Sequence, residues 1–432
     1  MSNTLSNTFA ADLSDMPDEG SSASKDAILQ ALSGIEDPDL HRSIVELGFI
    51  KELRVCGPNV AFSIELTTPA CPVKEQMQQA AHQVVAALPG VERVVVKMTA
   101  QTRTMPAIRN LIPGIKHAIA VAAGKGGVGK STTAVNLALA LAQSGAKVGL
   151  LDADIYGPSI PIMLGVPEGE GPLGSEEDGV QRIFPIERHG IKLMSIGFMT
   201  EKRDPIMWRG AMIHKMIQLM LSQVVWGELD YLIIDLPPGT GDVQLTLVQS
   251  APLTGALIVT TPEAVAVEDV MRAARMFSKM EAMKIKVPLL GVVENMSYFE
   301  APDGTRHYIF GEGGGLQVAN AFEVPLLGEV PRTIEITRGG DAGLPVVLAE
   351  PGSHAAKIYQ EIAGNVARRA ATLSVEAREF AEGAPLKTMD ELKAEIASGK
   401  ATPQDVAPRE RAGSAGTTAS AAEGTREGTR GP

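Results

Sequence analysis

The chain has 432 residues and a formal net charge of −12, from 39 basic and 51 acidic side chains. This length suffices for two or three domains with a sizeable core. The acidic balance disfavours a general nucleic-acid-binding protein, because phosphate backbones select basic surfaces. Cys56 and Cys71 are the only cysteines, which excludes a disulfide framework and is typical of a reducing cytoplasm.

The N-terminal segment, residues 1–23, is rich in Ser, Asp, Asn and Gly, and we expect it to be a disordered tail. It lacks the basic and apolar regions of a secretory signal. No apolar run in the chain approaches the roughly 18 residues that span a membrane. We therefore expect a cytoplasmic protein with no membrane and no nucleic-acid partner.

Residues 24–104 predict a small α+β domain. Its expected elements are two helices and three strands: Lys25–Leu32, Ile50–Val55, Val60–Leu66, Pro72–Leu88 and Val91–Met98. Residues 105–114, with two prolines, are interpreted as an interdomain linker.

A phosphate-binding loop follows, with the spacing Gly124-x-x-x-x-Gly129-Lys130-Ser131. The apolar run His117–Ala123 precedes it and the helix-like run Thr132–Gln143 follows it, which is the context that this motif needs. Backbone N–H groups and the positive end of a helix dipole suit phosphate oxygens. Lys130 is expected at the β- and γ-phosphates, and Ser131 at Mg²⁺. The predicted ATP contacts are Gly124, Lys125, Gly126, Gly127, Val128, Gly129, Lys130, Ser131 and Thr132.

Strand and helix patterns alternate over residues 115–371, which predicts an α/β domain with a doubly wound, mostly parallel sheet. The expected strands are Lys147–Leu151, Ile191–Ile196, Tyr231–Leu236, Ala256–Thr261 and Val287–Val293, and the helices include Arg209–Val225 and Ala264–Ala282. Ligands bind such a sheet at the carboxyl ends of its strands.

Three acids lie at those predicted strand ends. Asp152 and Asp154 leave the strand after the phosphate loop, and Asp235 ends the apolar run Leu232–Asp235 in the manner of a Walker B motif. Two adjacent carboxylates repel each other unless a cation such as Mg²⁺ shares them. The alternative for Asp152 and Asp154 is a polar loop.

Composition changes again after residue 371. Residues 372–432 are expected to be a mostly disordered tail. A capping box, Thr388-Met-Asp-Glu391, predicts one short helix to about Ala397. No basic amphipathic membrane helix is recognisable there.

Lys125, directly after the first glycine, makes this loop resemble the deviant Walker A loop of the SIMIBI P-loop ATPases, which include MinD, ParA and the nitrogenase iron protein. The resemblance implies a homodimer in which Lys125 reaches the partner's nucleotide; the alternative is a solvated loop lysine. It also implies that Asp152 lies near Mg²⁺, that Asp154 orients and deprotonates the attacking water, and that Asp235 binds Mg²⁺ through water. Lys125, Lys130 and Asp154 are then the catalytic residues. Asn295 is implied to contact adenine, or alternatively caps its strand.

The rest of the predicted ATPase domain resembles the Mrp/ApbC iron–sulfur carrier ATPases more narrowly. The strings that carry the likeness include Asp152-Ala-Asp-Ile-Tyr-Gly-Pro-Ser-Ile-Pro161, Asp235-Leu-Pro-Pro-Gly-Thr-Gly-Asp-Val-Gln244, Glu294-Asn-Met-Ser-Tyr-Phe299 and Gly339-Gly-Asp-Ala-Gly-Leu-Pro345. The front domain is similar to a small iron–sulfur assembly domain, through Asp37-Pro-Asp-Leu40, Leu47-Gly-Phe-Ile50 and Thr67-Thr-Pro-Ala-Cys-Pro72. Together they imply a slow ATP hydrolase that binds iron–sulfur clusters and transfers them to apoproteins.

One departure concerns the cluster ligands. Many members carry Cys-Pro-x-Cys shortly after the Asn-Met-Ser string, whereas this chain has Ala301-Pro-Asp-Gly304. Cys71 is the remaining candidate ligand, because a helix N-terminus favours the thiolate that ligates iron; the alternative is a buried apolar cysteine. Asp303 and His307 are further candidates.

The missing cysteines leave a second functional hypothesis open, a nucleotide-switched scaffold or positioning ATPase, similar to MinD or ParA, that holds no cluster. An electron-transfer ATPase is disfavoured, because the predicted ATPase domain contains no cysteine.

Overall fold

The computed structural model describes residues 23–38, 40–102, 112–177, 180–199, 210–280, 287–301 and 303–381. The predicted tail over residues 1–22, most of the predicted linker and the predicted helix Thr388–Ala397 lie outside these ranges. None of the helices in the described ranges is long and apolar enough to cross a membrane.

The front segment contains a three-stranded sheet covered by two helices. In chain order its main elements are α2 (Lys25–Leu32), β3 (Ile50–Cys56), β4 (Asn59–Leu66), α3 (Lys74–Ala86) and β5 (Arg93–Ala100). Strand β4 is central, antiparallel to β3 and parallel to β5, so α3 is the crossover that joins the parallel pair. Met77, Ala81 and Val85 recur at helical spacing and bury one face of α3 in the core of this segment.

The larger region is built on an eight-stranded sheet in the order β10-β11-β7-β12-β6-β13-β14-β17. All of its neighbouring strands are parallel except the edge pair of β10 and β11. Its strands are β6 (Ile115–Ala123), β7 (Val148–Asp152), β10 (Ile186–Arg188), β11 (Ile191–Ser195), β12 (Leu229–Asp235), β13 (Gly255–Thr260), β14 (Leu289–Asn295) and β17 (Leu326–Val330). The predicted α/β fold with a mostly parallel, doubly wound sheet is confirmed.

Each face of this sheet carries its own apolar core, and β6 shows how one strand serves both. Ala118, Ala120 and Ala122 lie in one core, whereas Ile119, Val121 and Ala123 lie in the other. This alternation follows from the two-residue period of a strand.

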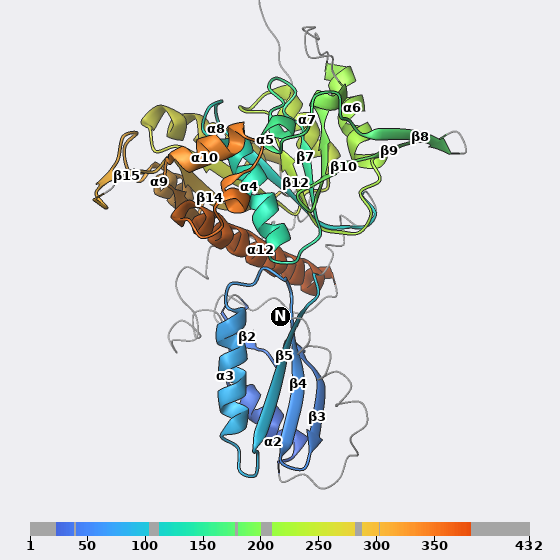
Figure 1. Cartoon of the computed structure of the whole chain (residues 1–432), viewed down its shortest axis with the longest axis vertical. Helices are drawn as coiled ribbons and strands as arrows, with labels where there is room; N and C mark the ends of the chain where they lie inside the picture. The colour runs from blue at the N-terminus through green and yellow to red at the C-terminus, as the bar shows by residue number, and fades with distance from the viewer. Residues whose placement is uncertain are drawn as a thin grey trace, which may run out of the picture. The chain divides into compact units, whose positions relative to one another are not determined.

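The first core is covered by α6 (Gly210–Ser222), α7 (Asp242–Ser250), α8 (Ala264–Met280) and α9 (Gly314–Ala321). The second is covered by α4 (Lys130–Gln143), α11 (Val346–Ala349) and α12 (His354–Ala381). Helices α4 and α12 pack side by side on that face (Figure 1).

Several elements lie outside the sequence expectation. The hairpin of β8 (Leu173–Glu177) and β9 (Val180–Phe184) forms a separate two-stranded sheet that projects from the larger region (Figure 1). Short elements α5 (Ile160–Met163) and η1 (Ile196–Met199) follow β7 and β11, and α10 (Ile334–Asp341) follows β17, the last strand of the main sheet. Strand β15 (Phe299–Glu300) pairs with β16 (Arg306–His307). Helix α12 continues past the expected boundary at residue 371. The division into domains at the predicted residues therefore stays a prediction.

Candidate nucleotide-binding site

The predicted phosphate-binding loop joins β6 to α4, as its flanking sequence indicates. Gly129 caps α4 in the left-handed conformation, with φ of 82°, which glycine adopts without steric cost. A Cβ on Gly129 would lie 2.0 Å from Asn295 Nδ2, and one on Gly124 would lie 2.2 Å from the backbone nitrogen of Val270. Close packing against the backbone of α8 therefore requires glycine at 124, and the left-handed turn requires it at 129.

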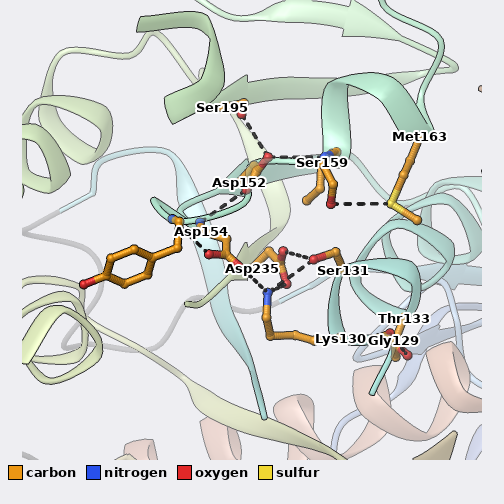
Figure 2. Close-up of polar contacts among 12 residues, drawn as sticks. Gly129, Lys130, Ser131, Thr133, Asp152, Asp154, Ser159, Met163, Ser195 and Asp235 are labelled. Atoms are coloured by element: carbon orange, nitrogen blue, oxygen red, sulfur yellow. Dashed lines mark hydrogen bonds and ion pairs between the residues drawn. The ribbon is translucent and has the colours of Figure 1, made fainter. Parts of the chain in front are cut away.

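Lys130 lies at the centre of the site, with only 6% of its surface exposed. Its Nζ donates to Asp235 Oδ1 at 2.8 Å and lies 3.3 Å from Asp154 Oδ2. The Ser131 hydroxyl donates to Asp235 Oδ2 at 2.6 Å. Figure 2 shows these side chains converging at the carboxyl ends of β7 and β12. The structure thus brings together the lysine, serine and two of the three acids predicted from separate motifs.

The third acid, Asp152, is fully buried beside this cluster. Its carboxylate accepts from the backbone N–H of Asp154 at 3.2 Å, the backbone N–H of Ile160 at 3.3 Å and the Ser195 hydroxyl at 2.9 Å. Burial, followed by the neighbouring charge of Asp235, raises the pKa of Asp152 to about 7. Burial likewise raises the pKa of Asp235, although Lys130 opposes the shift. A bound divalent cation would relieve this excess of negative charge.

Lys125 does not point freely into solvent. Its Nζ lies 3.6 Å from Glu263 Oε2, and both side chains are about one-third exposed. Glu263 also accepts a hydrogen bond from the Thr261 hydroxyl, so its carboxylate is held just before α8. Within this protomer, the lysine predicted to reach a partner's nucleotide is therefore paired with an acid that sequence reasoning did not single out.

Asn295 lies at the end of β14, and its amide donates to Val128 O at 2.8 Å. This hydrogen bond connects the end of β14 to the phosphate-binding loop. The predicted contact between Asn295 and adenine stays a prediction. One N–H of the amide donates to the loop, and the second N–H and the amide oxygen remain for a base.

The residues present fit a nucleotide with Mg²⁺. The loop offers backbone donors next to an N-terminal helix end, and Lys130 is a buried cation already among oxygen ligands. No group of three or more His, Cys, Asp or Glu within the described ranges is arranged to hold a metal ion alone. Mg²⁺ in proteins is usually held by one or two protein oxygens together with substrate phosphates and water, and Ser131 and Asp235 offer such oxygens.

Comparison with known proteins places this geometry in a family. The model of the NUBPL iron-transfer P-loop NTPases matches residues 114–367, which is more than half of the chain. The chain belongs to this iron-transfer P-loop NTPase family. A second model, of an iron–sulfur cluster assembly protein domain, matches residues 25–97.

Individual relatives of this iron-transfer NTPase span both regions. It is 48% identical over 353 residues to a protein named iron-sulfur cluster carrier protein of Synechocystis, which covers 80% of this chain and 98% of the relative. It is 46% identical to the chloroplastic Fe-S cluster assembly factor HCF101 of Arabidopsis thaliana, over 80% of this chain and 64% of that protein. A solved nucleotide-binding protein from Archaeoglobus fulgidus, in complex with ADP, is 42% identical over 55% of this chain and 90% of its own, with a TM-score of 0.45.

The candidate cluster ligands of this iron-transfer NTPase lie in two other places. Cys71 is half-buried between β4 and α3, three residues before the first residue of that helix, and Cys56 ends β3. Neither cysteine forms a disulfide. Asp303 and His307 lie on the exposed β15–β16 hairpin, where Asp303 Oδ1 accepts from the backbone N–H of Thr305 at 2.9 Å. The structure does not bring Cys71 together with Asp303 or His307 in any metal-binding group of described residues.

The loop that carries Cys71 is anchored by its neighbours. The Thr68 hydroxyl lies 2.8 Å from the Tyr231 hydroxyl at the start of β12, and both side chains are buried. A Cβ on Gly364 of α12 would lie 3.2 Å from Ala70 O, so a larger residue at 364 would press on this loop. Neither Thr68 nor Gly364 carries a sequence signal for this role.

Proposed function

We propose that this protein is an ATP-hydrolysing iron–sulfur cluster carrier that binds clusters and transfers them to apoproteins. The observation that carries the proposal is the assembly of Lys130, Ser131 and Asp235 around a glycine loop, within a family of iron-transfer P-loop NTPases. The two thiols of the chain suit a reducing cytoplasm, where we place the protein.

Nucleotide binding requires Lys130 to change partners. In this structure its ammonium forms ion pairs with both Asp235 and Asp154. The β- and γ-phosphates would take over Lys130, and Ser131 and Asp235 would hold Mg²⁺, which neutralises the charge that develops on the phosphates. Because Lys130 leaves Asp154, that carboxylate becomes available to accept a proton from the attacking water. A positioned base of this kind contributes about 10²–10⁴-fold to a rate.

The proposed working form is a homodimer. Lys125 would exchange Glu263 for the nucleotide of the partner subunit, as the resemblance of its loop implies. Binding and hydrolysis then shift the dimer between two arrangements, to the extent that ATP and ADP bind them with different affinities. Each protomer would contribute one Cys71 to the cluster, so that the dimer supplies two thiolates.

The direct test is anaerobic reconstitution with iron and sulfide, followed by iron analysis and the visible spectrum. The wild type is compared with Cys71→Ser and with Cys56→Ser as the matched control, since both remove one half-buried thiol. Cluster in the wild type and the control, but not in Cys71→Ser, supports a carrier with Cys71 as ligand. ATP-insensitive cluster affinity without transfer to any apoprotein argues strongly against the carrier.

One observation favours a second candidate, the scaffold or positioning ATPase. Ala301 and Gly304 stand where the family resemblance implies cluster cysteines, and no metal-binding group of three or more ligands is present among the described residues. Co-sedimentation with liposomes or DNA in the presence of ATP separates the two functions. ATP-dependent sedimentation of a protein that holds no cluster would favour the scaffold.

A further inference from the structure

Ser195 occupies a position that the ATPase motifs do not account for. It is the last residue of β11 and pairs in register with Asp152, the last residue of β7. Its side chain is fully buried. The hydroxyl donates to Asp152 Oδ2 at 2.9 Å and accepts from the backbone N–H of Gly197 at 3.0 Å. Because the Gly197 bond occupies an acceptor position, the single hydroxyl proton is directed at Asp152.

Asp152 in turn folds the segment that follows it. Its two carboxylate oxygens accept from the backbone N–H groups of Asp154 and Ile160, the latter at the start of α5. The carboxylate therefore ties both ends of the loop 152–160 to one point. Among the described residues, the ion pairs of Lys130 are with Asp154 and Asp235, so the orientation of Asp152 depends on these hydrogen bonds.

The turn after Ser195 touches the same loop a second time. A Cβ on Gly197 would lie 3.1 Å from Pro158 Cβ and 3.2 Å from Ser195 Oγ. A side chain at residue 197 would therefore press on Pro158, and glycine lets the turn approach the loop closely. The Ser195–Gly197 turn thus meets the loop 152–160 through one hydrogen bond to Asp152 and a close approach at Pro158. Figure 2 shows Ser195 on the side of Asp152 that faces away from Lys130.

We propose that Ser195 is a positioning residue for ATP hydrolysis, which acts by fixing Asp152 and, through it, the loop that presents Asp154. Its hydroxyl touches neither the phosphate loop nor Lys130. Loss of the hydroxyl would leave nucleotide affinity intact and loosen the placement of Asp154. This inference rests on the proposed ATPase activity for its kinetic consequence, but not for its structural one.

The test compares Ser195→Ala with Ser374→Ala. Ser374 is an equally buried serine on α12, whose hydroxyl donates to Ala370 O at 3.1 Å, so the control also removes one internal hydrogen bond. The first measurement is hydrogen exchange of the backbone amides of residues 152–160 without nucleotide. We expect exchange at Asp154 and Ile160 about tenfold faster in Ser195→Ala and unchanged in Ser374→Ala, because local opening then requires one hydrogen bond fewer.

The second measurement is steady-state ATP hydrolysis. We expect kcat of Ser195→Ala to fall by about 10- to 100-fold, since small misplacements of a reacting group have effects of this size. The KM for ATP should stay within about twofold, because the phosphate contacts are untouched. Ser195→Thr, which keeps the hydroxyl, should recover a large part of kcat and restore slow exchange.

Two results would overturn the proposal. Unchanged exchange over residues 152–160 would show that Asp152 is held without Ser195. A rise in KM at constant kcat would assign the hydroxyl to binding instead. If the wild-type protein does not hydrolyse ATP, the proposed function fails, while the exchange measurement still decides whether Ser195 fixes the loop.

Discussion

Strand β12 carries buried acids at both ends, and the two ends stabilise buried charge differently. At the amino end, Asp230 Oδ1 accepts from Lys116 Nζ at 2.7 Å and Asp230 Oδ2 accepts from the backbone N–H of Lys147 at 2.8 Å. Burial acts to raise the pKa of Asp230, but the hydrogen bonds and charge of Lys116 outweigh it and lower that pKa. At the carboxyl end, the pKa of Asp235 is instead raised by burial.

The groups around each acid show the same contrast. Next to Asp230, His117 stacks on Tyr231 with ring centroids 5.4 Å apart, and burial lowers the pKa of His117 to about 4. The amino end therefore holds an aromatic pair that is neutral near neutral pH. The carboxyl end gathers Asp154 and Asp235 around Lys130, with Asp152 buried nearby.

The two ends of β12 differ in how completely their acids are paired with cations, and the end where this pairing is incomplete is the candidate functional site. A paired acid such as Asp230 is part of the framework, and removing its partner would cost stability. Three buried carboxylates near one lysine, which pairs with two of them, are poorly balanced until phosphate and Mg²⁺ bind, and such imbalance is typical of a functional site.

Lys130→Ala sharpens this contrast most. We expect ATP affinity to fall by at least about 100-fold, equivalent to roughly 3 kcal/mol, because a buried charged hydrogen-bond partner of the phosphates is removed. The matched variant at the other end, Lys116→Ala, should lower the melting temperature and leave ATP affinity unchanged. Isothermal titration with ATP, together with circular dichroism as a folding check, measures both. Retained ATP binding by folded Lys130→Ala would refute the assignment of the loop.

Asp154→Asn should separate binding from turnover. We expect kcat to fall by about 10²–10⁴-fold, since the amide cannot accept the proton of the attacking water. ATP should still bind, because Lys130 loses a competing carboxylate. Asp230→Asn is the corresponding change at the amino end, and its kcat should equal that of the wild type. A steady-state phosphate-release assay decides the matter, and near-normal turnover of Asp154→Asn would transfer the role of base to another group.

His117→Phe tests the amino end through pH. The pKa of His117 is lowered from 6.5 to about 4 by burial, although Asp230 opposes the shift. The folded state thus binds the proton less tightly than the unfolded chain. The contribution of neutral His117 to the free energy of unfolding is therefore fully present above pH 6.5, and it is lost as pH falls towards 4. The shift corresponds to roughly 3 kcal/mol.

Phenylalanine keeps a ring against Tyr231 and does not titrate. Urea unfolding at several pH values should therefore show a stability curve for His117→Phe that is shallower than the wild-type curve between pH 6.5 and 4. Parallel curves would mean that His117 is not held neutral by burial.

The sequence was most informative where one motif dictates the geometry. Gly129, Lys130 and Ser131 are adjacent in the chain, and Asp152 and Asp235 end neighbouring parallel strands, so their meeting follows from the sheet topology. Ser195 ends the next parallel strand but belongs to no motif, and only the structure reveals its bond to Asp152 across 43 residues. Glu263 was missed for the same reason, because an acid at the start of a helix usually serves the helix dipole.

The C-terminal extension of α12 and the β8–β9 hairpin also could not be predicted from the sequence. The inner face of α12 runs from Val366, Ala367 and Ala370 on to Leu373, which packs against the core shared with α4, so the helix continues past residue 371. Alanines contribute little to the hydrophobic periodicity that marks a helix in a sequence. The change in composition after residue 371 therefore predicted an earlier end of the domain. Strands β8 and β9 pair with each other apart from one isolated bridge between Ile183 of β9 and Val224, so the main sheet gave no register from which to predict them.

Lys125 and Glu263 give the smallest expected effect, because an ion pair that is one-third exposed contributes at most about 1 kcal/mol. Glu263→Gln should release Lys125 and strengthen ATP-dependent dimerisation by up to about fivefold. Glu268→Gln is the control, since it alters an exposed pair with Arg272 on the same helix.

Lys125→Ala should spare ATP binding yet weaken dimerisation or turnover. Analytical ultracentrifugation with ATP measures the dimer constant. Identical constants in all variants, with unchanged turnover of Lys125→Ala, would remove the dimer argument and leave the pair as a loop contact in one protomer.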